Sequence, residues 1–240
     1  MKTINSIFIV ALLIFSLNIK AQNNHIKANG NVITATRTVD KFDKIYVSGS
    51  FDVDLVKGKE GAISIEASEN LMDVIVTEVF DGTLKIKFKK GVNIRNSKTI
   101  HITVSYETIE GVSLSGSGNI HAEDVVNAAN LDLSLSGSGS FKLGVSCTNL
   151  SSSISGSGNM NLNGKTDVFS CGISGSGNVN SSELTANIVN AKISGSGNLK
   201  VNAIHEINAK TSGSGNVRYT GNPTIVKANS SGSGSIHQKS

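Results

Sequence analysis

A short sequence, Ser-Gly-Ser-Gly followed by Asn or Ser, returns at nearly constant intervals along the second half of this chain. Its seven copies begin at Ser115, Ser136, Ser155, Ser174, Ser194, Ser212 and Ser231. The intervals between successive copies are 21, 19, 19, 20, 18 and 19 residues. A period near 19 residues is typical of stacked repeat proteins, in which each unit contacts its neighbours, and not of a globular domain with flexible linkers.

Between the copies, apolar and polar residues alternate, which is the signature of β-strands. Superposing the repeats aligns similar residues in columns, of which one holds Leu131, Leu150, Phe169, Val189, Ile207 and Val226. We therefore expect an all-β fold, a parallel β-helix (β-solenoid) with about 19–20 residues per coil. We also expect right-handed winding, because parallel crossover connections are right-handed in other sheets.

The repeated sequence is expected to form one corner of each coil. Its two glycines fall on the inward parity, where the lack of a side chain lets one backbone approach another. The residue after them tolerates left-handed φ when it is Asn, and stacked Asn side chains can hydrogen-bond from coil to coil. Ser140 and Ser235 stand at this position in two copies. The other five copies have Asn there, namely Asn119, Asn159, Asn178, Asn198 and Asn216.

The chain divides into four segments. Residues 1–21 have the features of a secretory signal peptide, namely Lys2, an apolar run from Ile7 to Leu17, and the small Ala21 at the cleavage site. The apolar run is shorter than the roughly 20 residues that span a bilayer. We expect a flexible lead-in at 22–37, in which 32–36 could add a short edge strand, then irregular longer N-terminal coils or a cap at 38–113, and the regular solenoid at 114–240.

Within the N-terminal segment, alternation over residues 42–55 predicts strands, and Val47 to Phe51 resembles a degraded copy of the later repeat. Asp81-Gly82, between two alternating segments, predicts a tight hairpin because both central residues of such a turn need positive φ. Residues 70–76 have apolar spacing that suits one helical turn, but we favour extended structure there because the hairpin strands follow directly.

The seven repeats follow a segment reading Phe42-Asp43-Lys44-Ile45-Tyr46-Val47-Ser48-Gly49-Ser50-Phe51-Asp52-Val53 and another reading Asp81-Gly82-Thr83-Leu84-Lys85-Ile86. Together they resemble the head GIN domain family of auto-transporter adhesins, which is found in exported proteins of Bacteroidetes-type bacteria. The resemblance extends over residues 39–236. It implies a right-handed β-helical domain outside the cytoplasm, and it implies no catalytic residues.

The charge of the chain excludes one class of partner. The formal net charge is +4, and removing residues 1–21 takes away Lys2 and Lys20 and no acid, which leaves +2. This is too small to suggest nucleic acid binding. The signal peptide predicts export to the periplasm, the outer-membrane surface or the extracellular space, with no stable membrane span after cleavage.

Two sets of basic residues are candidates for contact with a ligand. One is an outward row that follows the repeats, which reads His121, Lys142, Asn161, Asn180, Lys200, Arg218 and His237. The other is the strand that carries Lys85, Lys87 and Lys89. Both could contact acidic glycans or phosphate. The structural alternatives are a solvated face for the row and, for the strand, lysines that keep a sheet edge from pairing with other chains.

The sequence offers little for enzymatic chemistry. The acidic residues of the repeats are dispersed, with only Glu123 and Asp124 adjacent, and the five histidines lack metal-ligand spacing. We therefore expect no catalytic residues, no metal and no cofactor. Cys147 and Cys171 lie out of phase in the repeat, which argues against a disulfide and makes Cys171 a small core residue.

The leading functional hypothesis is a non-enzymatic exported β-solenoid that acts as an adhesin or binds a polysaccharide or another cell-envelope component. The alternative is an assembly module that forms homo-oligomers through uncapped solenoid ends, where strand edges are unpaired. A third hypothesis is a polysaccharide-degrading enzyme, since parallel β-helices host such activities. That reaction needs clustered carboxylates, which the repeats lack.

Overall fold

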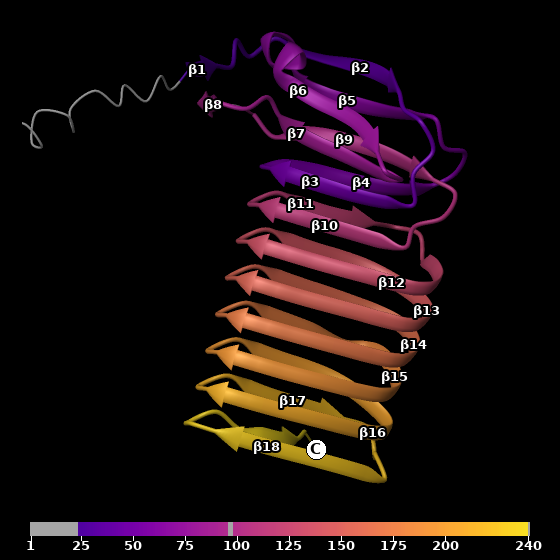
Figure 1. Cartoon of the computed structure of the whole chain (residues 1–240), viewed down its shortest axis with the longest axis vertical. Coiled ribbons are helices and arrows are strands. Elements are labelled where there is room, and N and C mark those ends of the chain that lie inside the picture. The colour runs from indigo at the N-terminus through magenta and orange to yellow at the C-terminus, as the bar shows by residue number, and fades with distance from the viewer. Residues whose placement is uncertain (1–23, 96–97, 240) are drawn as a thin grey trace, which may run out of the picture.

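The computed structural model describes residues 24–95 and 98–239, and the predicted signal peptide at 1–21 lies outside the described residues. The described chain is an elongated stack of flattened coils with a cap at its N-terminal end (Figure 1). Among these residues, the helical structure is one short 3₁₀ segment, which is too short to cross a membrane.

The N-terminal half contains shorter strands. They are β1 (Asn24–Lys27), β2 (Val32–Thr38), β3 (Lys44–Gly49), β4 (Phe51–Lys57), β5 (Ala62–Ser68), the 3₁₀ helix η1 (Glu69–Val74), β6 (Ile75–Phe80), β7 (Thr83–Phe88), β8 (Val92–Arg95), β9 (Ile100–Tyr106), β10 (Gly111–Gly116) and β11 (Asn119–Ala122).

The C-terminal half contains longer strands that bend around the coil. They are β12 (Val126–Gly137), β13 (Ser140–Gly156), β14 (Asn159–Gly175), β15 (Asn178–Gly195), β16 (Asn198–Gly213), β17 (Asn216–Thr220), β18 (Ile225–Ser231) and β19 (Ile236–Gln238).

The predicted parallel β-solenoid is confirmed. Every strand pairing from β10 to β19 is parallel, and Leu150 pairs with Phe169, which pairs with Val189, as the aligned columns require. In Figure 1 the front strands run leftward to the Ser-Gly corner, and β17 returns rightward behind them while the chain descends. This winding is right-handed, as expected.

The glycine corners show why the repeat is so regular. Gly175, the first glycine of its copy, has a φ of 115°, and a Cβ placed there would lie 2.6 Å from the carbonyl oxygen of Gly156 in the preceding coil. A Cβ on Gly177 would lie 2.5 Å from Cγ2 of the core residue Ile154. The first position therefore needs glycine for its backbone conformation, and both need it because the coils approach closely.

The predicted Asn ladder is also present. Asn178 donates to Asn159 at 3.1 Å, Asn198 donates to Asn178 at 2.9 Å, and Asn216 donates to Asn198 at 3.1 Å. The prediction that these Asn residues adopt left-handed φ was wrong. Among the described non-glycine residues, Asp81 alone has a positive φ. The first glycine of each copy has the positive φ instead, and the Asn three residues later begins the next strand.

Spatial order differs from chain order at the N-terminal end. The coil made by β7 and β9 stacks on the coil made by β3 and β4, which stacks on β10 and β11. After β1 and β2, the chain thus forms the second coil, builds the rest of the cap and the first coil, and then returns to the third. Val47–Phe51 forms the corner of the second coil, in register with the first repeat, since Ser48 and Gly49 pair with Ser115 and Gly116.

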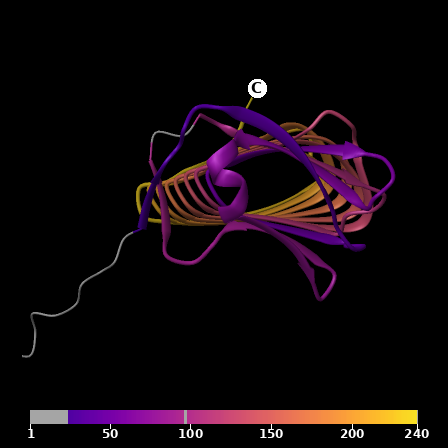
Figure 2. The same ribbon diagram turned by 90° about the horizontal axis from the view of Figure 1, so that it is seen from above.

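Antiparallel strands close this end of the stack. β6 pairs with β7 on one face, while β5 pairs with β9 and β2 on the other. η1 lies across the end of the coils when the molecule is seen from above (Figure 2), and its Leu71 and Met72 are buried. The hairpin predicted at Asp81-Gly82 is confirmed, with φ values of 49° and 66°.

Two expectations for this region differ from the structure. The short edge strand allowed at 32–36 is present as β2, whereas the flexible lead-in expected around it is wrong where β1 forms. Arg37 of β2 donates to the carbonyl oxygens of Ile75 and Met72, each at 2.6 Å. Residues 70–76, expected to be extended, lie mostly in η1 because the apolar side chains of one turn cover the core. In both cases a tertiary partner decided the local structure.

The two cysteines are free thiols, as predicted. Cys171 pairs in register with Ser152 and is buried, whereas Cys147 is half-buried with its Sγ 3.5 Å from the Thr166 hydroxyl. Burial raises the pKa of the Cys171 thiol to about 12. The thiol therefore behaves as a small apolar core residue at neutral pH.

Candidate functional site

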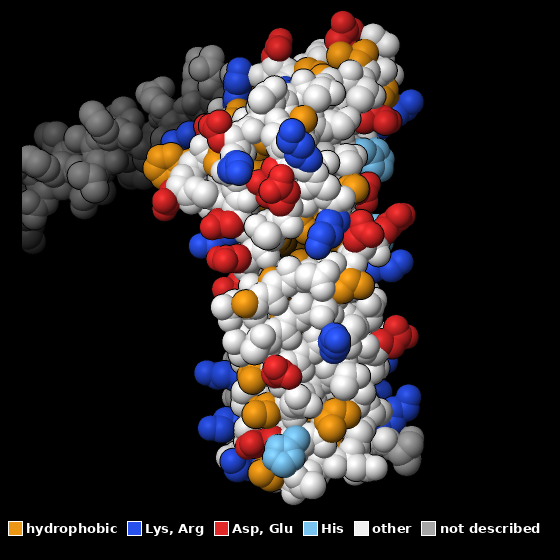
Figure 3. All heavy atoms as spheres, turned by 90° about the vertical axis from the view of Figure 1, so that its right-hand side faces the viewer, with side chains coloured by type: hydrophobic (Ala, Val, Ile, Leu, Met, Phe, Trp, Pro, Cys, Tyr) orange, Lys and Arg blue, Asp and Glu red, His pale blue; other side chains and the backbone are white. Residues whose placement is uncertain are grey.

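The flattened coils present two broad outer faces. The front face, toward the viewer in Figure 1, carries the residues that precede each Ser-Gly corner, and the back face carries those that follow it. Figure 3 looks onto the edge between them and shows lysine and arginine side chains at both margins of the lower coils. Each face therefore has to be considered as a binding surface.

A hollow of about 860 Å³ lies on the front face of the lower coils. We call it the lysine trough. Its floor is the backbone of a column of small residues, which includes Cys171, Ala191 and Ala209. Two outward rows flank it: Ser151, Ser170, Asn190, Asn208 and Lys227 on one side, and Ser153, Gly172, Lys192, Lys210 and Asn229 on the other.

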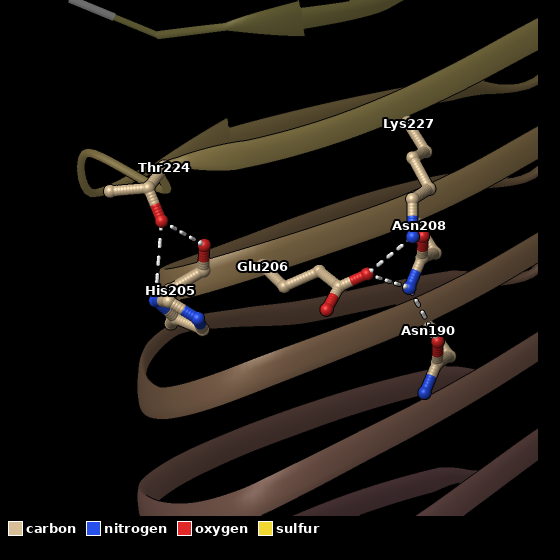
Figure 4. Close-up of polar contacts among 6 residues, drawn as sticks. All are labelled: Asn190, His205, Glu206, Asn208, Thr224 and Lys227. Atoms are coloured by element: carbon tan, nitrogen blue, oxygen red, sulfur yellow. Dashed lines mark hydrogen bonds and ion pairs between the residues drawn. The ribbon is translucent and has the colours of Figure 1, made fainter.

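Hydrogen bonds between coils hold one wall of the lysine trough in place (Figure 4). Asn208 donates to Asn190 at 3.1 Å and to the Glu206 carboxylate at 3.0 Å, and Lys227 donates to the same carboxylate oxygen at 2.9 Å. These bonds hold the pKa of Glu206 below its ordinary value, and the hydrogen bond from Lys227 has the largest effect. The Lys227 charge is thus shared with Glu206.

The opposite wall keeps its charge available. Lys192 and Lys210 are exposed and pair in register on adjacent coils, and neither takes part in an ion pair within the described residues. Adjacent coils in a parallel sheet lie about 4.8 Å apart. Two unpaired ammonium groups at this spacing form a strip that favours closely spaced anions.

A second hollow, of about 570 Å³, continues the same two rows at the upper end of the front face. We call it the hairpin cleft. It brings the predicted residues Lys85 and Lys87 together with Lys44, Tyr46 and Asp132. The register shows the continuity, because Lys85 pairs with Tyr46 and Tyr46 pairs with Ser113 in the row that later holds Lys192.

The predicted lysine strand is β7, which pairs with β3 on one side and β6 on the other. The interpretation of these lysines as protection of a sheet edge is therefore wrong. Lys87 forms an ion pair with Glu78 at 2.7 Å, and this bond lowers the pKa of the Glu78 carboxyl. Lys85 lies over the Phe80 ring at 4.5 Å, and Lys89 lies just beyond the end of β7 and does not line the cleft.

The predicted row after the repeats lies on the back face in one column, as the register of His121 with Lys142 and of Lys200 with Arg218 shows. The structure does not gather it into one site. Two coils that carry Asn161 and Asn180 separate Lys142 from Lys200. His121 lies 3.6 Å from the Asp54 carboxylate, and a small hollow of about 380 Å³ lies beside Lys200 and Arg218.

The sequence reasoning missed the trough residues Lys192, Lys210 and Lys227 as candidate contacts. Their signal was in the alignment of the repeats, where Lys192 and Lys210 occupy the same outward position of adjacent coils. What the sequence did not show is that the strand with Lys85 shares their face. Within the described residues, no group of three or more His, Cys, Asp or Glu side chains could hold a metal ion.

The sequence also matches a known protein family. Residues 41–223 match the family described as "Putative auto-transporter adhesin, head GIN domain". The chain belongs to this family. The resemblance seen in the repeats and the N-terminal segment is confirmed. No curated protein matches the chain.

Solved structures of other bacterial proteins share the fold of this GIN-domain protein. A "putative adhesin" from Bacteroides fragilis is 28% identical with a TM-score of 0.86, and the match covers 89% of this chain and 100% of that one. A "putative lipid binding protein" from Parabacteroides distasonis is 27% identical with a TM-score of 0.76, over 90% and 100% of the two chains. A "putative adhesin" from Parabacteroides merdae, at 23% identity and a TM-score of 0.72 over 90% and 100%, shows the fold alone.

Proposed function

We propose that this protein is a non-enzymatic, exported adhesin that binds an anionic polysaccharide of the cell surface or envelope along the lysine trough. The observation that carries the proposal is the pair of lysines without ion-pair partners, Lys192 and Lys210, on adjacent coils beside a hollow of about 860 Å³. Membership of an adhesin family and the adhesin named from B. fragilis support a surface-binding role.

The shape and chemistry of the trough suit a linear chain. Its long axis follows the solenoid axis, so that equivalent hydroxyl and amide groups recur at each coil. Ser and Asn side chains can exchange hydrogen bonds with sugar hydroxyls, while Lys192 and Lys210 pair with carboxylate or sulfate groups. Lys227 contributes less, because Glu206 already accepts a hydrogen bond from its ammonium group.

The test uses alginate, a linear polyuronate, immobilised for surface plasmon resonance. We expect the double variant Lys192→Gln and Lys210→Gln to bind at least 10-fold more weakly than the wild type. The matched control, Lys142→Gln with Lys200→Gln, removes the same charge from the back face and should bind within 2-fold of the wild type. Greater loss in the back-face pair, or no alginate binding by the wild type, would overturn the proposal.

Glu206 offers a sharper test of the same surface. Replacing it with Gln releases Lys227 from its ion pair and removes a negative charge from beside the trough. We expect Glu206→Gln to bind alginate about 3-fold more tightly, and the gain should disappear in 0.5 M salt because exposed charges are screened there. Unchanged or weaker binding at low salt would contradict the role assigned to the trough.

A second candidate function is self-association through the last described coil. β18 pairs with β16 along one edge, and no described strand pairs with its other edge. Val226 of this strand is 47% exposed, whereas the five preceding members of its column are buried. Sedimentation velocity should show a dimer that forms with concentration and is lost in Val226→Lys. A monomer at all concentrations would exclude this function.

A further inference from the structure

The hairpin cleft differs chemically from the lysine trough. Four successive coils of the front face contribute to it, through Lys85 of β7, Lys44 and Tyr46 of β3, Ser113 of β10 and Asp132 of β12. With Lys87 of β7, it therefore combines three ammonium groups, a phenol ring with its hydroxyl, and a carboxylate. The trough, in contrast, has no carboxylate among the residues that line it.

Three polar groups of the hairpin cleft are not used by the fold. Within the described residues the Tyr46 hydroxyl and the Asp132 carboxylate have no hydrogen-bond partner, and Lys44 has no ion-pair partner. Lys87 is different, since Glu78 holds its ammonium group at 2.7 Å. Polar side chains that converge on a hollow without protein partners are available to a ligand.

The position of Lys44 depends on a glycine. A Cβ on Gly111 would lie 3.3 Å from Cγ of Lys44 and 3.8 Å from its Cδ, so the Lys44 stem lies against this glycine. Gly111 is the residue of its row between Lys44 and Asp132. A lysine and an aspartate thus share one wall of the cleft without approaching within the 4.0 Å of an ion pair.

Two aromatic side chains that are not buried, Tyr46 and Phe80, lie at this end of the front face. Tyr46 is half-buried and lines the cleft. Phe80 is 67% exposed on β6, which diverges from the outline of the coils in Figure 2, and Lys85 lies 4.5 Å from its ring centroid. The contact with Phe80 holds the Lys85 ammonium beside the cleft without neutralising it.

The charges of these groups disfavour two simple kinds of ligand, an inorganic anion and a neutral sugar. Asp132 repels a bare inorganic anion, whereas a neutral sugar leaves Lys44 and Lys85 without a partner. A sugar that carries a carboxylate satisfies all of them: the two lysines pair with its carboxylate, and Asp132 accepts hydrogen bonds from its hydroxyls. The Tyr46 ring offers an apolar surface for the C–H face of the sugar.

We propose that the hairpin cleft is a recognition subsite for a single uronic acid residue. This inference rests on the proposed function in one respect, because a uronate is a building block of the polysaccharide class assigned to the trough. The site itself is separate. Its residues belong to β3, β7, β10 and β12, and none of them lines the lysine trough.

The experiment is a ligand-observed NMR titration of the full chain with sodium glucuronate, with glucose and sodium acetate as controls. We expect glucuronate to bind with a millimolar constant and glucose and acetate to bind at least 10-fold more weakly. Asp132→Asn and Lys44→Gln should each weaken glucuronate binding at least 5-fold. Tyr46→Phe should retain most of the affinity and Tyr46→Ala should lose it, because the ring is kept in one and removed in the other.

Matched controls separate this inference from the proposed function. Lys142→Gln on the back face and the trough pair Lys192→Gln with Lys210→Gln should leave glucuronate binding within 2-fold. Asp132→Asn should retain alginate binding through the trough. Acetate that competes as well as glucuronate, or Asp132→Asn and Tyr46→Ala variants that fold normally by circular dichroism and bind glucuronate unchanged, would overturn the subsite whatever the alginate result.

Discussion

The N-terminal cap and the regular stack of this GIN-domain protein solve different problems with different chemistry. The stack from β12 to β16 uses parallel pairing, small corners and side-chain ladders between identical positions. The cap uses antiparallel pairing, the Arg37 hydrogen bonds to Ile75 and Met72, and the Phe51–Phe88 ring contact at 4.5 Å between centroids. Each contact in the cap occurs once, whereas the same contacts recur from coil to coil in the stack.

This difference also separates the two candidate binding surfaces. The hairpin cleft, next to the cap, is built from unlike residue types, which suits recognition of one chemical group. The lysine trough repeats Ser, Asn and Lys along the axis, which suits a polymer with a repeating structure. A repeated surface favours contacts that recur, while the irregular coils provide a place where unlike groups converge.

The largest effect is expected from a methyl group at a corner of the stack. Gly175→Ala places a Cβ 2.6 Å from the Gly156 carbonyl at a residue with a φ of 115°. We expect a loss of about 4 kcal/mol in the free energy of unfolding, from backbone strain and overpacking together. Urea denaturation measures it.

Gly172 provides the matched control within the same coil. A Cβ there meets no atom within 4 Å, and its φ is not in the positive range. Gly172→Ala should be neutral or stabilising by about 0.5 kcal/mol, because it restricts the unfolded chain. Equal effects of the two substitutions would show that the corner is not the constraint on the stack.

A cavity in the cap should have a smaller and more local effect. Leu71 of η1 is fully buried, and Leu71→Ala should cost about 3 kcal/mol through the lost burial and the cavity left behind. Because each coil contacts only its neighbours, hydrogen exchange should accelerate in β2 and β5 and stay slow in β14. Uniform acceleration along the chain would mean that cap and stack unfold as one unit.

Alkaline pH should weaken the stack through Cys171. Burial raises the pKa of this thiol from its ordinary value of 9.0 to about 12, so the folded chain keeps the thiol proton over a range in which the unfolded chain loses it. Stability contributed by this group therefore falls as pH rises from 9 toward 12. At pH 10.5 the wild type should have lost about 2 kcal/mol more than Cys171→Ala. If the stability of the wild type and of Cys171→Ala fell equally with rising pH, the buried thiol would not be the cause.

The smallest effect is expected from one step of the Asn ladder. Asn198→Ala removes hydrogen bonds to Asn178 and Asn216 and should cost about 1 kcal/mol. Asn161 is exposed, has no side-chain hydrogen bond within the described residues, and serves as the control, with an expected change near zero. A thermal unfolding series on both variants would show whether the ladder stabilises the stack.

Local patterns were enough to predict the architecture of the stack. The period of Ser-Gly-Ser-Gly, the aligned apolar columns and the out-of-phase cysteines each depend on spacing along the chain, and spacing sets the register when successive coils pair in parallel. The hairpin at Asp81-Gly82 was predictable for a similar reason, because the two turn residues determine it locally.

Tertiary structure decided what local patterns do not contain. The coil of β3 and β4 lies between those of β7–β9 and β10–β11, although it comes first in the chain, and β1, β2 and η1 form where partners cover or pair them. The candidate clefts arise the same way, since Lys85 meets Tyr46 and Asp132 only after the coils stack out of order. Spacing in the sequence determines which side chains share a column, but the order in which coils stack depends on which edges and apolar ends remain to be covered.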